Sequence, residues 1–161
     1  MYRAIFASML LLLGLLAGCS AISPFSTLTK LDVALTASEQ VNPDLHGRPS
    51  PVVVHLIELR HAVAFENADF FGLYSNAEQA LPKDWVSSEE VELRPGESLA
   101  LKLRLDPGTR FLGVLAAYRD LPHVQWRWVV PVTPQQLTRA DLVLDQTGIR
   151  LASPNSDMEA Q

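Results

Sequence analysis

A run of eight residues, SLALKLRL at positions 98 to 105, places leucine at every second position and fills the alternate positions with small, polar or charged residues. Side chains repeat with a period of two along a strand, so the leucines share one face and the charges share the other. A helix would distribute the same leucines around its circumference. Val91 and Leu93 show the same alternation upstream, and Pro95-Gly96 between the two segments supplies the backbone angles of a tight turn. The pattern predicts a β-hairpin.

Several other segments have strand character. Residues 111 to 118, FLGVLAAY, are continuously apolar, which is typical of an interior strand covered on both faces. Pro131 has no N–H for a ladder, so its strand is expected to lie at a sheet edge or to end there. Further strands are predicted at residues 30 to 36, 51 to 59, 126 to 132, 141 to 145 and 148 to 152. We therefore predict an all-β fold, an antiparallel two-sheet β-sandwich of about eight strands.

Two insertions have helical character. Within residues 65 to 81, FENADFFGLYSNAEQAL, the residues Phe70, Leu73, Tyr74 and Ala77 follow helical spacing, which predicts one or two short helices covering the sandwich. The segment TPQQL at residues 133 to 137 begins with a threonine that can cap a helix, followed by a proline suited to the first helical position. It predicts a single helical turn between strands.

The amino-terminal segment is organised like a secretory signal. One positive charge at Arg3 precedes a run from residue 4 to 17 that is apolar or small apart from Ser8. A membrane-spanning helix needs about 20 apolar residues, and this run is shorter and interrupted by glycine. Residues 16 to 19, LAGC, resemble the lipobox of bacterial lipoproteins, in which the cysteine receives a diacylglycerol before the signal is cleaved. Cys19 is the single cysteine of the chain.

The lipobox implies a domain organisation. We expect a signal peptide at residues 1–18, an acylated Cys19 and a periplasmic tether at 19–29, a β-sandwich domain at 30–152, and a flexible tail at 153–161. Cys19 would carry a covalent diacylglycerol and an N-acyl chain, which attach the protein to a membrane without spanning it. In such signals an aspartate directly after the cysteine favours retention in the inner membrane. This chain has Ser20 at that position, which favours sorting to the outer membrane. A cleaved signal without lipidation is the alternative.

Charge and side-chain chemistry exclude several classes of function. The chain has 13 Lys and Arg against 18 Asp and Glu, with no basic run, which argues against nucleic acid as a partner. Its four histidines form no metal-ligand motif and no GxSxG elbow is present, so we predict no enzyme, no metal and no small-molecule substrate. Exposed tryptophans could bind carbohydrate or another envelope ligand, but Trp126 and Trp128 share one strand face, which favours a core role.

The connection between the first two predicted strands is the most irregular part of the pattern. It runs from residue 37 to 50, ASEQVNPDLHGRPS, whereas hairpin loops usually contain about two to five residues. Prolines at positions 43 and 49 restrict its backbone, which lowers the cost of ordering it on a partner. A connection of this length is usually functional or disordered, and a surface loop without function is the alternative.

Short motifs along the chain occur in the order and spacing of one protein family. They are Asn42-Pro43-Asp44, GRPSPVVV at residues 47 to 54, Leu56, Leu59, Phe65, ADFF at 68 to 71, Leu73-Tyr74, Pro95-Gly96, Gly113-Val114 and AYRD at 117 to 120. With the lipobox, these motifs resemble the type VI secretion lipoprotein family known as TssJ, over Cys19 and roughly residues 30 to 151. The resemblance implies a transthyretin-like β-sandwich with short added helices.

The resemblance also implies a role in assembly. Such lipoproteins sit on the periplasmic face of the outer membrane and bind the carboxy-terminal periplasmic domain of TssM, an inner-membrane protein that also joins TssL. The complex anchors a contractile injection machine. A major partner contact in the family lies on the loop between the first and second strands. The corresponding residues are Glu39, Gln40, Val41, Asn42, Pro43, Asp44, Leu45, His46, Gly47 and Arg48. The resemblance does not separate residues that contact the partner from residues that shape the loop.

Overall fold

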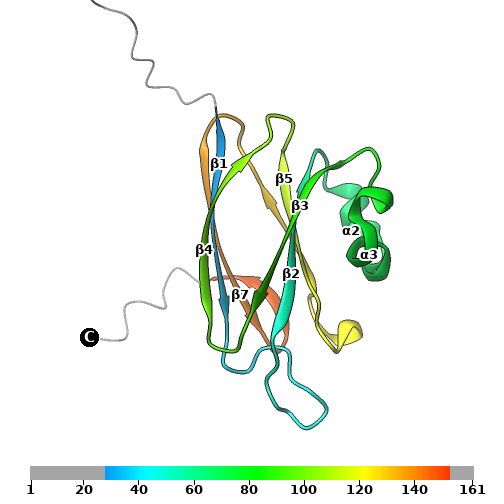
Figure 1. Cartoon of the computed structure of the whole chain (residues 1–161), viewed down its shortest axis with the longest axis vertical. Coiled ribbons are helices and arrows are strands. Elements are labelled where there is room, and N and C mark those ends of the chain that lie inside the picture. The colour runs from blue at the N-terminus through cyan, green and yellow to red at the C-terminus, as the bar shows by residue number, and fades with distance from the viewer. Residues whose placement is uncertain (1–27, 153–161) are drawn as a thin grey trace, which may run out of the picture.

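A computed structural model describes residues 28–152, and in them two layers of strands form a β-sandwich flanked on one side by short helices (Figure 1). The elements are β1 (Thr29–Ala37), β2 (Val52–Leu59), α2 (Val63–Asn67), α3 (Phe70–Ala80), β3 (Trp85–Leu93), β4 (Ser98–Leu105), β5 (Phe111–Ala116), the 3₁₀ helix η2 (Leu121–His123), β6 (Arg127–Pro131), β7 (Leu137–Asp145) and β8 (Gly148–Leu151). The predicted sandwich is confirmed. The predicted signal, Cys19, most of the tether and the tail lie outside the described residues.

The two sheets have four strands each, in the orders β4-β1-β7-β8 and β3-β2-β5-β6. Neighbouring strands are antiparallel except β1 and β7, which run parallel from the pair Lys30 and Leu137 to the pair Ala37 and Leu144. The prediction of a wholly antiparallel sandwich is therefore wrong for this pair. Parallel neighbours need a long connection, and most of the domain separates β1 from β7 in the chain. No local turn signal could reveal their pairing.

The turn at Pro95-Gly96 is present, but it does not close a hairpin. Gly96 has a φ of 76° and Glu97 N donates to Arg94 O at 3.0 Å. β3 pairs with β2 in one sheet, whereas β4 pairs with β1 in the other. The turn thus carries the chain across the edge of the sandwich, and the predicted β3–β4 ladder is wrong. The predicted alternation is confirmed, because the β4 leucines face inward; Leu101 is only half-buried, since β4 is an edge strand.

The main core lies between the two sheets and is built from alternate positions of the strands. On β1, Leu31, Val33 and Leu35 are buried and alternate with exposed or half-buried positions. Val52 and Val54 of β2 meet them from the opposite sheet within one apolar cluster. Burying one such side chain contributes about 1.5–3 kcal/mol. The period-two pattern of the sequence therefore decides which face of each strand packs inward.

A second apolar cluster lies between the β2–β5 part of its sheet and the helices. It contains Ile57, Leu59, Phe65, Leu73 and Leu115, all buried. β5 is therefore covered on both faces, as the continuous apolar run predicts. A Cβ at position 113 would lie 3.0 Å from atoms of Leu59 and Phe65, so glycine there allows the helical layer to approach the sheet closely. β6 lies at the sheet edge, as predicted from its proline.

The predicted helices over residues 65 to 81 are confirmed as α2 and α3. Asp69 caps α3, since its carboxylate accepts from Gly72 N at 2.9 Å. The Arg127 guanidinium of β6 lies 4.2 Å from the Trp126 ring centroid and donates to the carbonyls of Phe65 and Ala68, at 2.9 and 2.8 Å. These bonds join the helical layer to the sheet. No helix within residues 28–152 is long and apolar enough to cross a membrane.

The prediction of a helical turn at residues 133 to 137 is wrong. Gln136 N donates to Thr133 O at 3.4 Å, and Gln135 has a φ of 59°. A positive φ at the third position of a four-residue turn is incompatible with a right-handed helix. Proline at the second position suits this turn as well as it suits a helix start, so the local sequence did not discriminate between them.

Candidate functional site

The long connection between β1 and β2 lies at one end of the sandwich, opposite the end where β1 begins (Figure 1). β1 runs the length of the domain and delivers the chain to this end, and β2 carries it back. The loop is anchored to both neighbouring elements at its start. Ser38 N donates to Leu144 O of β7 at 2.8 Å, and Gly96 N of the β3–β4 turn donates to Ser38 O at 3.3 Å.

Buried residues hold the base of the loop. Val41 is fully buried in the main core. Asn42 is 4% exposed, and its side-chain amide donates to Pro51 O at 2.8 Å while its Oδ1 accepts from Arg119 N at 2.9 Å. Its φ is 48°, a left-handed conformation that asparagine tolerates better than most residues. Ser50 N closes the base by donating to Val41 O at 3.2 Å. Asn42 thus joins the two ends of the loop to the segment that follows β5.

The Asp44 carboxylate organises the tip of the loop. It accepts from the backbone N–H groups of His46 and Arg48, at 2.8 and 3.0 Å, and forms an ion pair with the Arg48 guanidinium at 2.8 Å. Gly47, with a φ of 75°, completes the turn by donating to Asp44 O at 2.9 Å. The backbone and side-chain hydrogen bonds from Arg48 hold the pKa of Asp44 below its ordinary value. The tip is therefore shaped by its own hydrogen bonds before any partner is present.

The apex of the loop presents an apolar side chain to solvent. Leu45 is 102% exposed, the largest value among the exposed large hydrophobic residues of the described chain. His46, Arg48 and Pro49 beside it are also exposed. Single exposed leucines are common at protein surfaces, but this one stands at the apex of a loop with a fixed shape. A rigidly presented apolar side chain is the usual anchor of a protein interface.

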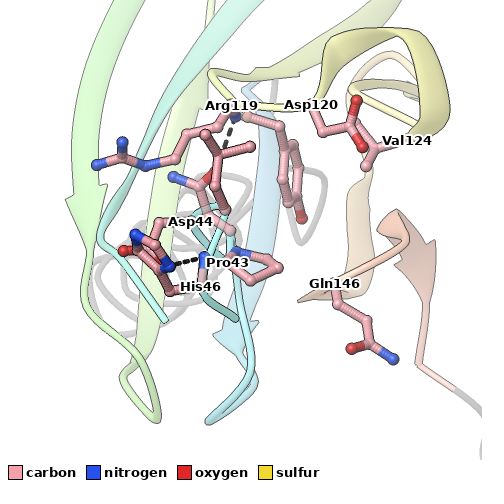
Figure 2. A pocket seen from close by; sticks show the side chains of 10 residues that line it. Pro43, Asp44, His46, Arg119, Asp120, Val124 and Gln146 are labelled. Carbon is pink, nitrogen blue, oxygen red and sulfur yellow. Dashed lines mark hydrogen bonds between the residues drawn. The ribbon is translucent and has the colours of Figure 1, made fainter. Parts of the chain in front are cut away.

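A groove of about 560 Å³ separates the loop from the segments on its other side. Figure 2 shows Pro43, Asp44 and His46 along one wall and Asp120, Val124 and Gln146 along the other, with Arg119 above them in this view. The lining consists of Asn42, Pro43, Asp44, Leu45, His46, Tyr118, Arg119, Asp120, Val124 and Gln146. The groove is thus formed by the loop, the segment around η2 and the β7–β8 turn.

Tyr118 gives the groove an unsatisfied polar group. The residue is only 5% exposed, and within the described residues its hydroxyl has no hydrogen-bond partner. Burial raises the pKa of Tyr118 well above its ordinary range, and the negative charge of Asp145 adds to this effect. The hydroxyl therefore stays protonated and can both donate and accept a hydrogen bond. A buried polar group without a partner is costly, so this hydroxyl lowers the stability of the domain.

The structure divides the predicted loop residues into two groups. Val41 and Asn42 form the base of the loop, and Asp44 shapes its tip. Pro43 is half-buried between them. The exposed residues, which are accessible to a partner, are Glu39, Gln40, Leu45, His46, Gly47 and Arg48. The far wall of the groove was missed as a site. Residues 118 to 120 belong to the AYRD motif that carried the family resemblance, so this motif was the signal that could have identified them.

Other chemistry finds little support in the described part of the chain. Within residues 28–152 no group of three or more histidine, cysteine, aspartate or glutamate side chains could hold a metal ion. The His55 ring has a packing role, because it stacks on Tyr74 at 4.8 Å between centroids. All three tryptophans are half-buried and pack against the apolar clusters, which disfavours a carbohydrate site built on them.

Comparisons with known proteins identify the family. A family model described as "Type VI secretion lipoprotein, VasD, EvfM, TssJ" matches residues 29–148. The T6SS lipoprotein TssJ1 from Pseudomonas aeruginosa is 38% identical, with a TM-score of 0.75 over 78% of this chain and 95% of that one. Lip of Serratia marcescens, a membrane-bound component of the type VI secretion system, is 25% identical, with a TM-score of 0.73 over 78% and 97% of the two chains.

A chain in a structure titled "T6SS protein TssM C-terminal domain (869-1107) from EAEC" is also similar, with 26% identity and a TM-score of 0.65 over 78% of this chain and 98% of that chain. A search of curated proteins found no match. Family membership assigns the chain a structural role in the membrane complex and not a catalytic one. The chain belongs to the TssJ family of type VI secretion lipoproteins.

Proposed function

We propose that this chain anchors the type VI membrane complex to the outer membrane. In this proposal Cys19 carries the acyl chains, and the β1–β2 loop with its groove binds the periplasmic C-terminal domain of TssM, which links the chain to TssL. Similarity to a membrane-bound type VI lipoprotein and to a chain in a structure titled with the TssM C-terminal domain supports the proposal. The match extends over most of the domain, from residue 29 to 148.

The observation that carries the proposal is the fully exposed Leu45 on a loop whose shape is fixed from within. An interface residue contributes most when its apolar side chain becomes fully desolvated and when little conformational entropy is lost. Asp44 and Asn42 hold the loop, so the entropy cost is largely met on folding. Leu45 can therefore enter an apolar pocket on the partner without reorganising the domain.

The groove beside the loop suits a segment of the partner. Arg119 and Asp120 offer both signs of charge at its rim. A segment seated there would contact the loop and the η2 region together. The area involved would be larger than the loop tip alone could provide, as a specific interface requires.

Titration calorimetry with the purified mature chain and the TssM periplasmic domain tests the proposal. Leu45→Asp should weaken binding at least tenfold, because it places a charge where an apolar anchor is buried. Val63→Asp makes the same change at an exposed position of α2, 67% exposed, and should leave affinity unchanged. Thermal melts of both variants should match that of the wild-type chain, since neither side chain is in the core.

A second variant tests the whole tip. Replacing residues 43 to 49 with a short Gly-Ser connection retains Val41, Asn42 and Ser50, so the base of the loop and the fold should persist. A replacement that extended from Glu39 to Arg48 would remove the buried Val41 and Asn42 and would confuse folding with binding. Undiminished affinity of a folded tip replacement would place the interface elsewhere on the sandwich.

A further inference from the structure

The end of the sandwich where β1 begins is rich in exposed cations. Five of them, Lys30, Arg60, Lys83, Arg104 and Arg110, form what we call the basic end. Lys30 of β1 lies opposite Arg104 of β4 in the sheet register. The other three lie together where β2, β3 and β5 meet, since the Arg60 guanidinium donates to Lys83 O at 3.3 Å and Arg110 N donates to Leu59 O at 2.9 Å. Among the described residues, none of the five side chains forms an ion pair with a carboxylate.

The charge at this end contrasts with the rest of the chain. The protein is acidic overall, with a formal net charge of −5. Carboxylates also lie at this end, and each has other partners or neighbours. Asp84 contacts the His61 ring at 2.8 Å, Asp106 accepts from Gly108 N at 2.8 Å, and Glu58 accepts from Asp106 N at 3.0 Å. Asp32 lies opposite Lys102 and Arg139 in the sheet register.

The loop end carries both signs of charge: the acidic residues Glu39, Asp44, Glu97, Asp120 and Asp145 lie there with the cations Arg48, Arg94, Arg119 and Arg150. Within the described residues, the cations of the basic end therefore lack carboxylate ion pairs, whereas Arg48 and Arg150 at the loop end are paired with Asp44 and Asp145.

The position of the basic end relative to the amino terminus suggests a role for its unpaired cations. The described structure begins at Leu28, directly before β1, and the chain from Cys19 to Leu28 can extend at most about 30 Å. If Cys19 is anchored in a bilayer, the basic end is the part of the domain held closest to that bilayer. A tether this short gives the basic end a high effective concentration at the membrane surface, so a weak contact is sufficient.

We propose that the basic end docks on the anionic phospholipid headgroups of the bilayer that holds the acyl chains of Cys19. The docking rests on the lipid attachment in the proposed function, and charge complementarity selects the occupant. Each Lys or Arg near an anionic lipid surface contributes attraction that decays within a Debye length of about 8–10 Å. Leu137, paired with Lys30 in the register and 44% exposed, adds an apolar contact at the same edge.

Docking fixes the orientation of the domain on the membrane. β1 has 9 residues and so separates the basic end from the loop by about 30 Å. With the basic end on the headgroups, β1 stands away from the membrane and the loop faces the periplasm (Figure 1). A tethered domain without this contact would rotate and present the loop in many directions. The contact thus lowers the orientational cost of meeting a partner that arrives from the inner membrane.

Vesicle co-sedimentation with the unacylated mature chain, carrying Cys19→Ser, tests the docking directly. The chain should bind vesicles of phosphatidylethanolamine with phosphatidylglycerol and cardiolipin, should not bind pure phosphatidylethanolamine or phosphatidylcholine vesicles, and should dissociate at high salt. The double variant Lys30→Gln/Arg104→Gln should lower the partition coefficient about 25-fold, at about fivefold per cation. The matched variant Arg94→Gln/Arg150→Gln makes the same charge change at the loop end, where Arg150 lies beside Asp145, and should lower it less than threefold.

Two outcomes would overturn the docking. No binding to anionic vesicles at low salt would show that the basic end does not dock on phospholipid headgroups. Equal losses in the two double variants would mean that only net charge matters. Neither result depends on acylation or on TssM. A failure of the proposed function would be seen instead in palmitate labelling and in calorimetry, so the two failures are distinguishable.

The orientation can be measured on the same vesicles. In the Cys19→Ser background, a dye on Gln136→Cys lies at the basic end, because Lys30 N donates to Gln136 O at 3.0 Å, whereas a dye on Leu45→Cys lies at the loop apex. Acceptors on lipid headgroups should quench the dye at position 136 strongly and the dye at position 45 weakly. Equal quenching at both positions would show that the bound domain has no preferred orientation.

Discussion

Replacing Asn42 with alanine should destabilise the domain substantially, although the residue lies in a loop. The side chain makes two part-buried hydrogen bonds, each contributing about 0.5–1.5 kcal/mol net. Alanine at a φ of 48° adds about 1–2 kcal/mol of backbone strain that asparagine largely avoids. The sum is about 3 kcal/mol, a large share of a typical total stability of about 5–15 kcal/mol.

Equilibrium unfolding in urea, followed by tryptophan fluorescence, measures this loss. With a typical slope of about 2 kcal/mol per molar urea, the midpoint should fall by about 1.5 M with little change in slope. Gln40→Ala provides a matched control, since Gln40 is exposed and only its backbone N–H bonds to Ser38, at 3.3 Å. That control should stay within about 0.5 kcal/mol of the wild-type stability.

Amide hydrogen exchange at Arg119 locates the effect. This N–H donates to Asn42 Oδ1, so its exchange should be slow in the wild-type chain and fast in Asn42→Ala. A midpoint within about 0.3 M of the wild-type value would refute the reasoning. So would a full loss of stability with the Arg119 amide still protected, because the loss would then come from another contact.

Three further changes have defined outcomes. Cys19→Ser should abolish palmitate labelling and outer-membrane fractionation, because serine lacks the nucleophilic thiolate; labelled protein in the outer membrane would contradict the lipobox assignment. The pKa of the Asp44 carboxyl, measured by NMR titration, should lie below its ordinary value of 3.8. The ionised carboxylate therefore holds the tip at pH values above 3.8, and the tip loosens as the pH falls through the lowered pKa. A pKa at or above 3.8 would contradict the hydrogen bonds described for this group. Tyr118→Phe should leave the unfolding midpoint unchanged or slightly raised, since the buried hydroxyl has no partner within the described residues; a midpoint lowered by about 0.5 M urea or more would show that the hydroxyl is hydrogen-bonded.

Local chemistry determined much of the fold. The alternation of β4, the apolar run of β5 and the edge position of the Pro131 strand follow from side-chain period and backbone donors, which act within a few residues. The helices over residues 65 to 81 likewise follow from spacing and from the cap at Asp69. The length of the β1–β2 connection also marked the candidate site, because a compact domain rarely keeps a long loop that has no function.

The sequence alone left the strand pairings undetermined. The parallel β1–β7 pair and the placement of β3 and β4 in different sheets depend on which apolar faces meet across the core, and contacts between distant segments decide that. At residues 134 and 135 two local structures were equally compatible with proline, and the path between β6 and β7 selected the turn with positive φ.

The roles of the loop residues were decided at the same level. By type alone, Asn42, Asp44 and Arg48 are equal candidates for contacting a partner. The tertiary structure buries Asn42 against Arg119, directs Asp44 to the backbone of its own loop, and leaves Leu45 exposed at the apex. The groove and the basic end likewise combine residues that are far apart in the chain. Sequence period determines which side of an element is apolar, whereas only the packed domain determines which polar groups are satisfied internally and which remain available.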